Sequence, residues 1–223
     1  MSDPKRAKTD DEAAADDEAI YEAAFQQLQE AQDHLEKLND EASDAVLAVE
    51  QKYNKIRRPI YMQRNQIISG IPEFWLNSFY NHPVLSELLT EQDQQVFKYL
   101  TEIDVEDFED VKSGYKITFV FDENPYFTDK QMVKTFNFAE NGNLSIEGTK
   151  ADWRPGMCLT GDDEEDEDGK RKFESDSFFK WLEVEEVLED GSHDDVADII
   201  KDDLWPNPYK YYTMEAEEDE FEG

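Results

Sequence analysis

The chain has 223 residues, and its 56 Asp and Glu outnumber 22 Lys and Arg, so the formal net charge is -34. Such a field repels nucleic acids and anionic membranes and favours cationic partners, while 14 Phe, 10 Tyr and 4 Trp indicate a buried core that a disordered acidic polymer would lack. A single cysteine excludes an internal disulfide framework, and no apolar run approaches the ~18 residues of a membrane span, so we expect an intracellular, soluble protein.

Residues 1–18 combine a basic cluster, Lys5-Arg6-Ala7-Lys8, with acids and alanines and show no sustained apolar period. We expect a flexible tail here. The basic cluster matches a nuclear-import signal only as a weak motif.

Residues 19–69 carry the pattern of one long helix. From Tyr21 to Val49, apolar residues follow one another in alternating steps of three and four, which is a heptad seam of about four repeats. Pro59 is expected to kink or interrupt the helix because proline removes a backbone donor and clashes with the preceding turn. At 1.5 Å per residue the helix would be roughly 70 Å long, too long to be covered by its own domain.

The seam needs a partner because the other faces of this helix are polar. The simplest partner is a second copy of the chain, so the sequence predicts a homodimer; the alternative is that the seam packs on the globular part of its own chain. The residues expected at the interface are Leu28, Ala31, Leu35, Leu38, Ala42, Ala45 and Val49. The flanking positions carry no decisive charge code, so parallel and antiparallel pairing both stay open.

The globular part is expected to span residues 70–213, beginning where Gly70-Ile71-Pro72 ends the helix. Residues 83–100 read as an amphipathic helix with residues 91–95 exposed. Alternating apolar residues then predict strands at 102–108, 115–121, 132–138 and 144–149, with Asn141-Gly142 as a hairpin turn. These segments predict a four-stranded antiparallel sheet.

Residues 161–172 form an acidic loop with seven consecutive carboxylates between two glycines. A calcium loop with Gly169 as its turn glycine would need a glutamate at its closing position, where Ser175 stands instead. We therefore expect a disordered, solvated loop, no metal site and no cofactor.

Two further helices are expected, at residues 175–182 and 194–204. In the second, Val196, Ile199, Ile200 and Leu204 form an apolar stripe, and Asp195, Asp198 and Asp202 share the opposite face. Helices on one face of the sheet give an α+β fold. Residues 214–223 return to an acidic tail.

Signatures of an enzyme are missing from the sequence. His34, His82 and His193 lie far apart, and there is no phosphate-binding glycine loop and no nucleophile elbow. His34 is expected on the surface, His82 at a turn or helix cap, and Cys158 as a buried structural thiol.

One basic cluster, Lys52, Lys55, Arg57, Arg58 and Arg64, lies near the end of the long helix. We expect these side chains to neutralise acids of a partner subunit or of the globular part. The functional alternative is a weak phosphate contact, carried by Lys52, Lys55, Arg57 and Arg58.

Several segments, in this order, resemble the nucleosome assembly protein family, and within it the SET or template-activating factor branch. They are residues 50–55 (EQKYNK), 71–75 (IPEFW), 108–115 (FEDVKSGY), 121–127 (FDENPYF), 177–181 (SFFKW) and 200–208 (IKDDLWPNP). The resemblance covers roughly residues 20–212.

The resemblance implies a histone chaperone without catalytic activity, located in the nucleus, with the cytoplasm as an additional location left open. It implies antiparallel dimerisation through the long helix and an "earmuff" domain at each end, whose acidic and mixed-charge underside binds core histones and, in this branch, duplex DNA. It also implies a second hypothesis, namely non-catalytic inhibition of a type 2 protein phosphatase.

The charge supplies a mechanism for the first hypothesis, because an anionic surface attracts basic histones and shields them from non-specific contacts with DNA. The residues expected to contact histones are Asp195, Asp198, Asp202 and Asp203 on the last predicted helix, with Asp122 and Glu123 at a strand end. Asp122 and Glu123 precede Asn124-Pro125, so a plain turn is an equal alternative for them.

Overall fold

The computed structural model describes residues 10–110, 112–139, 141–161, 177–189 and 192–214, with side chains from Tyr21 onward. The chain divides into two compact units, residues 1–56 and residues 57–223. Among the described residues, none of the helices combines the length and the apolar character that crossing a membrane requires. The expectations for residues 1–9, for the acidic loop from residue 162 onward and for residues 215–223 lie outside these ranges.

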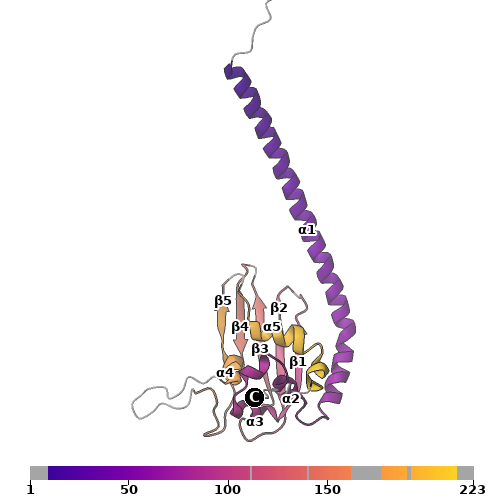
Figure 1. Cartoon of the computed structure of the whole chain (residues 1–223), viewed down its shortest axis with the longest axis vertical. Helices are drawn as coiled ribbons and strands as arrows, with labels where there is room; N and C mark the ends of the chain where they lie inside the picture. Colours follow the sequence, from indigo (N-terminus) through magenta and orange to yellow (C-terminus); the bar gives the residue numbers. More distant parts are fainter. Residues whose placement is uncertain (1–9, 111, 140, 162–176, 190–191, 215–223) are drawn as a thin grey trace, which may run out of the picture. The chain divides into compact units, whose positions relative to one another are not determined.

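Helix α1 runs from Asp10 to Ile68 without a break (Figure 1). Residues 10–18, expected in the tail, are therefore helical. Pro59 lies inside α1 and does not interrupt it. Its side chain is exposed, so the carbonyl group that loses a donor at this turn can be solvated.

The apolar seam of the first unit is exposed to solvent in the single chain. From Tyr21 to Ile56 the side chains are exposed, apart from the half-buried Leu47, Gln51 and Asn54. Leu28 is 63% exposed and Leu35 54% exposed. A helix with such a stripe is stabilised by a partner surface more than by its own propensity.

The sheet has five antiparallel strands in the order β1-β2-β3-β4-β5. They are β1 (Leu100–Asp107), β2 (Gly114–Phe121), β3 (Gln131–Phe138), β4 (Leu144–Gly148) and β5 (Glu186–Leu188). The first four confirm the expected strands, and the expected total of four is wrong. The fifth pairs with β4. It spans only three residues, too few to show an alternating pattern in the sequence.

Alternation along the strands separates a buried face of the sheet from a half-exposed one. Ile103, Ile117, Phe119, Met132 and Phe136 point to the buried face and are completely covered. The short helices of the second unit lie against the sheet in Figure 1, and they contribute a cluster of aromatic rings to this core. The rings of Phe79 and Phe97, for example, meet edge to face at 5.0 Å.

The expected helix at residues 83–100 is wrong. Three short elements precede β1: α2 (Phe74–Tyr80), which was not expected, η1 (Leu85–Leu88) and α3 (Glu91–Phe97). Thr90 has an extended backbone and caps α3, because its hydroxyl accepts from the Asp93 N–H and the Asp93 carboxylate accepts from the Thr90 N–H. This capping box separates η1 from α3.

Asp93 is buried rather than exposed as expected. Its carboxylate also accepts hydrogen bonds from the Ser177 hydroxyl and the Phe178 N–H at the start of α4 (Phe178–Glu183). One carboxylate therefore holds the first turns of α3 and α4 together. Residues 175–176 of the helix expected at 175–182 lie outside the described ranges.

The end of α4 rests on a buried lysine. Lys134 of β3 is completely covered, and its ammonium donates to the carbonyl groups of Trp181 and Val184 at 2.6 and 3.1 Å. Burial lowers the Lys134 pKa. Gly148, opposite Lys134 on β4, allows this approach, since a Cβ atom there would lie 2.3 Å from the Leu182 carbonyl oxygen.

The free edge of β1 is covered by side-chain donors. Trp75 donates its indole N–H to the Thr101 carbonyl, and Trp205 donates to the Ile103 carbonyl, both at 3.2 Å. Asn65 of α1 donates to the Ile103 carbonyl as well, at 3.4 Å. These contacts block the pairing of another strand at this edge.

Candidate acidic binding surface

The helix expected at residues 194–204 is present as α5 (Asp195–Ile199) followed by the π-helical turn η2 (Ile200–Leu204). Within this segment, three apolar residues are completely buried, namely Ala197, Ile200 and Leu204. Val196 and Ile199, expected in the same stripe, are only half-buried. The segment thus has a fixed apolar side that turns its carboxylates outward.

Asp194 fixes the start of α5. Its carboxylate accepts from the Ala197 N–H at 3.0 Å, and the Trp181 indole N–H donates to both of its oxygens at 3.0 and 2.9 Å. An N-cap of this kind stabilises a short helix by about 1 kcal/mol. It connects the acidic segment to α4 and through it to the core.

The π turn changes which side chains face water. The Trp205 N–H donates to the Ile200 carbonyl, five residues earlier, at 2.8 Å. Asp202 and Asp203 are therefore both exposed, while Lys201 folds back over the Tyr115 ring at 4.4 Å. The sequence period of a regular helix could not show this shift.

Three of the four expected acids form one surface. The Asp195 side chain is 84% exposed and pairs with His193 at 2.9 Å, Asp202 is exposed, and Asp198 is half-buried. Burial, and then the neighbouring charges of Asp202 and Asp194, raise the Asp198 pKa, although His193 and Lys201 act against this. We call Asp195, Asp198 and Asp202 the α5–η2 acidic surface.

The start of β2 extends this field. Burial raises the pKa of the Tyr115 hydroxyl, and the charges of Asp198, Asp194, Asp202 and Asp107 raise it further. Asp107, at the end of β1, was not among the expected residues. The strand pattern could not reveal it, because its place 3.7 Å from Lys201 of η2 depends on the packing of segments almost a hundred residues apart.

Asp203, the fourth expected acid, is engaged within the chain. Its carboxylate accepts from the Tyr211 hydroxyl at 2.6 Å and lies 3.5 Å from His82 Nε2. The Tyr211 hydrogen bond is the main cause of a lowered Asp203 pKa. Its side chain is still 55% exposed, so it contributes charge but is less free to reorient toward a partner.

Asp122 and Glu123 lie away from this surface. They follow the last residue of β2, whereas Tyr115 lies at the start of that strand, so about 20 Å of extended strand separates the two places. Both are exposed. The expected turn is present, since the Asn124 side chain accepts from the backbone N–H groups of Tyr126 and Phe127.

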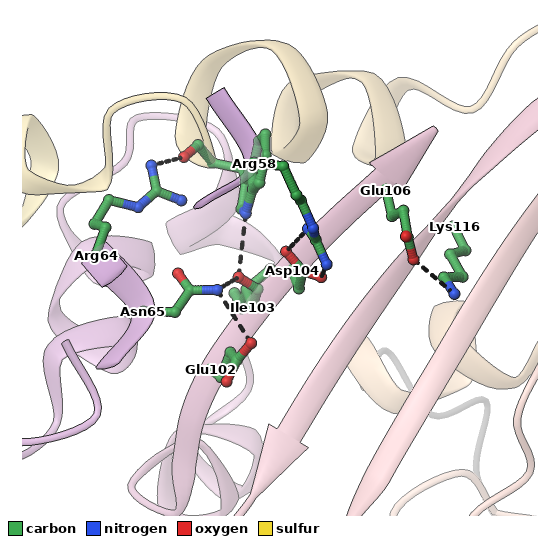
Figure 2. Close-up of polar contacts among 9 residues, drawn as sticks. Arg58, Arg64, Asn65, Glu102, Ile103, Asp104, Glu106 and Lys116 are labelled. Carbon is green, nitrogen blue, oxygen red and sulfur yellow. Dashed lines mark hydrogen bonds and ion pairs between the residues drawn. The ribbon is translucent and has the colours of Figure 1, made fainter. Parts of the chain in front are cut away.

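One member of the basic cluster, Arg58, binds an acid of the chain itself. In Figure 2, Arg58 reaches Asp104 on β1 with two hydrogen bonds, at 2.6 and 2.7 Å. The hydrogen bond with Asp104 is the main cause of a raised Arg58 pKa. Arg58 therefore neutralises an acid of the globular unit. Lys52 and Lys55 are exposed, and Arg57 is half-buried.

Further acids of β1 are paired in the same way. Glu106 forms an ion pair with Lys116 at 2.8 Å, and the Asn65 side chain donates a hydrogen bond to Glu102 at 3.1 Å (Figure 2). The Lys116 hydrogen bond is the main cause of a lowered Glu106 pKa. These acids of β1 are occupied by contacts within the fold.

The histidine and cysteine side chains, which are the usual candidates for catalysis or metal binding, lie in structural surroundings. His82 is buried, and its Nδ1 accepts from the N–H groups of Val84 and Leu85, which confirms the expected cap. His34 is exposed as expected. Cys158, expected to be buried, is only half-buried and lies 3.4 Å from the Thr160 hydroxyl. Within the described residues, no three or more His, Cys, Asp or Glu side chains gather where they could hold a metal ion.

Comparison with known proteins identifies the family. The model of the nucleosome assembly protein family matches residues 69–215. The chain belongs to the nucleosome assembly protein family. NAP1-related protein 2 of Oryza sativa subsp. indica is 52% identical over 221 residues, which cover 96% of this chain and 88% of that protein.

Other relatives place the chain with the SET branch. Protein SET of Drosophila melanogaster is 39% identical over 232 residues, covering 95% of this chain and 83% of that protein. The crystal structure of nucleosome assembly protein S from Plasmodium falciparum matches with a TM-score of 0.66 and 27% identity, over 84% of this chain and 99% of that one. The fold and family implied by the sequence motifs are thereby confirmed.

Proposed function

We propose that this protein is a nuclear histone chaperone that binds core histones through the α5–η2 acidic surface and acts as a homodimer joined through α1. The observation that supports the surface most directly is that Asp195 and Asp202 are exposed while the acids of β1 are paired with cations or donors of the fold. Such carboxylates bind a basic partner at little cost, since only the exposed contact between Asp195 and His193 has to be broken among the contacts of the described residues.

The mechanism is competition between polyanions. Histones are basic, and a chain with a net charge of -34 attracts them over a distance set by the ionic strength. A bound histone is shielded from non-specific contact with DNA. Exposed ion pairs are individually weak, about 0.2–1 kcal/mol each, so the histone can be released when DNA offers a better set of charges.

The test is a titration with each of the two core-histone pairs across a salt series. We expect binding to weaken steeply as salt rises, and the substitution of Asp195, Asp198, Asp202 and Asp203 by Asn to weaken it further. Unchanged affinity in that variant would reject the surface assignment. Asp122→Asn with Glu123→Gln, tested separately, decides whether the second acidic place contributes.

Two alternatives stay predictions. Inhibition of a type 2 protein phosphatase would need a docking surface whose affinity falls much less with salt, so the same salt series applied to a phosphatase distinguishes the two functions. For duplex DNA, Arg58 is a poor candidate because Asp104 occupies it, and the exposed Lys52 and Lys55 are better ones.

A further inference from the structure

Ser192 lies between β5 and α5, next to the α5–η2 acidic surface in the sequence. The residue is exposed, and its hydroxyl makes no hydrogen bond with another described residue. Its backbone N–H donates to the Glu189 carbonyl at 3.0 Å, and residues 192–194 have no regular secondary structure. An exposed hydroxyl on an irregular segment is accessible to an enzyme that modifies proteins.

The charge around Ser192 is negative. Residues 181–200 contain eight Asp and Glu and no Lys or Arg. Glu189 lies three residues before Ser192, and Asp195 lies three residues after it with a side chain that is 84% exposed. Complementary charge favours a protein kinase whose substrate cleft is basic, and it disfavours a kinase that requires arginine before the acceptor.

An acid three residues after a hydroxyl is common in so acidic a chain, so burial has to distinguish the candidates. Among the described residues, this spacing occurs at Thr90, Thr101, Thr149, Thr160 and Ser192. Ser192 is the exposed one of these five.

The four threonines have structural roles or are covered. The Thr90 hydroxyl caps α3, and Thr160 is only 6% exposed. The hydroxyls of Thr101 and Thr149 donate to the carbonyl groups of the neighbouring strands, at Val120 and Val133. The structure therefore selects Ser192 from positions that the sequence pattern treats alike.

We propose that Ser192 is phosphorylated by a protein kinase with a basic substrate cleft, and that the phosphate strengthens the α5–η2 acidic surface. In the transfer, Ser192 Oγ forms a bond with the γ-phosphorus of ATP, and the bond from that phosphorus to the β–γ bridging oxygen breaks. ADP leaves, and the hydroxyl proton passes to a carboxylate of the kinase.

The kinase can reach this segment without unfolding the core. A substrate cleft binds an extended segment, and the Asp194 backbone is already extended. Asp195 is the first residue of α5, and its carboxylate is exposed. The first buried residue of α5 is Ala197, which lies beyond the acid that the kinase has to bind.

The phosphate would add to the charge that attracts a basic partner. At pH 7 it contributes about 1.5 to 2 negative charges and three acceptor oxygens, beside a surface built from three carboxylates. His193, which pairs with Asp195 at 2.9 Å, is adjacent to Ser192. A pair between His193 and the phosphate would release Asp195 for the partner. This consequence rests on the proposed function.

Mapping of phosphate by mass spectrometry tests the site in the full chain. The chain is incubated with Mg²⁺, ATP and a serine/threonine kinase that requires a carboxylate three residues after its acceptor. A second arm uses a kinase that requires arginine before its acceptor. We expect phosphate on Ser192 in the first arm only, and none on Thr101 or Thr149 in either arm.

Two results would overturn the assignment. One is the absence of phosphate from Ser192 in the first arm. The other is phosphate on Thr101 and Thr149 to the same extent as on Ser192, because exposure would then not select the acceptor.

Two substitutions with the same change in charge test the recognition. Asp195→Asn should lower the initial rate of Ser192 phosphorylation about ten-fold, because it removes the carboxylate three residues after the acceptor. Asp198→Asn removes a carboxylate six residues after the acceptor, and the rate should stay within about two-fold of the parent. Asp194, which caps α5, is kept in both variants. Equal rates in the two variants would show that Asp195 is not recognised.

Titration with a core-histone pair tests the consequence for binding. At low salt we expect the dissociation constant of the phosphorylated chain to be about three-fold lower than that of the untreated chain. Ser192→Ala, treated in the same way, should show no change. Unchanged affinity with Ser192 fully modified would refute the effect on the surface. If neither form binds histones, the proposed function fails, whereas the mapped phosphate still decides whether Ser192 is the acceptor.

Discussion

Asp93 and Asp195 are the same side chain in opposite surroundings. Asp93 has no exposed surface and accepts hydrogen bonds from two helix starts, whereas the side chain of Asp195 is 84% exposed and is paired with His193. One holds α3 to α4, and the other is available to a partner. In a chain with 56 acids, the surroundings of a carboxylate indicate its role better than its charge does.

The same contrast separates β1 from α5–η2. On β1, Asp104 and Glu106 face Arg58 and Lys116, and so part of the negative charge is neutralised inside the fold. On α5–η2, the Lys201 ammonium lies over the Tyr115 ring and 3.7 Å from Asp107, and Asp202 is exposed. Negative charge is therefore more freely available for binding on α5–η2 than on β1.

The largest expected effect is on stability, from Asp93→Ala. It leaves buried N–H and O–H donors at Thr90, Ser177 and Phe178 without an acceptor, so we expect a loss of about 4 kcal/mol in the free energy of unfolding. Urea denaturation measures it. Asp195→Ala, the control, should stay within about 0.5 kcal/mol of the parent. Similar losses in both variants would show that the buried and the exposed carboxylate do not differ in their structural role.

Arg58→Ala should have the next largest effect. The Asp104 side chain is only 14% exposed, so removing its bidentate partner leaves a poorly solvated charge, and we expect a loss of about 2 kcal/mol. Arg58→Lys keeps the positive charge but cannot form the two parallel hydrogen bonds of the guanidinium, so it should lose about half as much stability as Arg58→Ala. The control is Lys150→Ala on an exposed side chain; if it costs as much as Arg58→Ala, the pair with Asp104 has no special role.

Asp203 is partly exposed but is also hydrogen-bonded within the fold. The effect of replacing it on stability should therefore depend on pH. Its lowered pKa means that the contact with Tyr211 stabilises the fold above the unfolded carboxyl value of about 3.9, and that this contribution is lost as the pH falls through the lowered value. The melting temperature of Asp203→Asn should lie below the parent at pH 7 and converge with it in acid. A constant difference down to pH 3 would argue against this linkage.

The sequence predicts the elements whose signal is local. The heptad seam gave α1, and alternating apolar residues gave β1 to β4 within one or two residues of their ends. The acids of α5–η2 were also recognisable, because they lie opposite the predicted apolar stripe of Val196, Ile199, Ile200 and Leu204, of which Ile200 and Leu204 are completely buried.

What the sequence could not predict depends on residues far apart in the chain. The break at Thr90 is stabilised through Asp93 by Ser177, 84 residues away, so the stretch reads as one helix. An apolar groove at the end of α1 likewise combines Ile60 and Ile67 with Pro208 and Tyr209, more than a hundred residues later. The sequence also ranked Arg58 with Lys52 and Lys55, because the ion pair with Asp104 has no trace in the pattern of either segment.

The most direct test of the account compares two variants with the same change in net charge. Asp195, Asp198 and Asp202 are changed to Asn in one, and the exposed Glu87, Glu91 and Glu147 to Gln in the other. Binding of a core-histone pair is then measured by calorimetry at one salt concentration. We expect the first variant to bind about ten-fold more weakly than the parent, as three exposed ion pairs of about 0.5 kcal/mol each would give, and the second to change little. Equal weakening in both would contradict a defined surface and would assign binding to the overall charge.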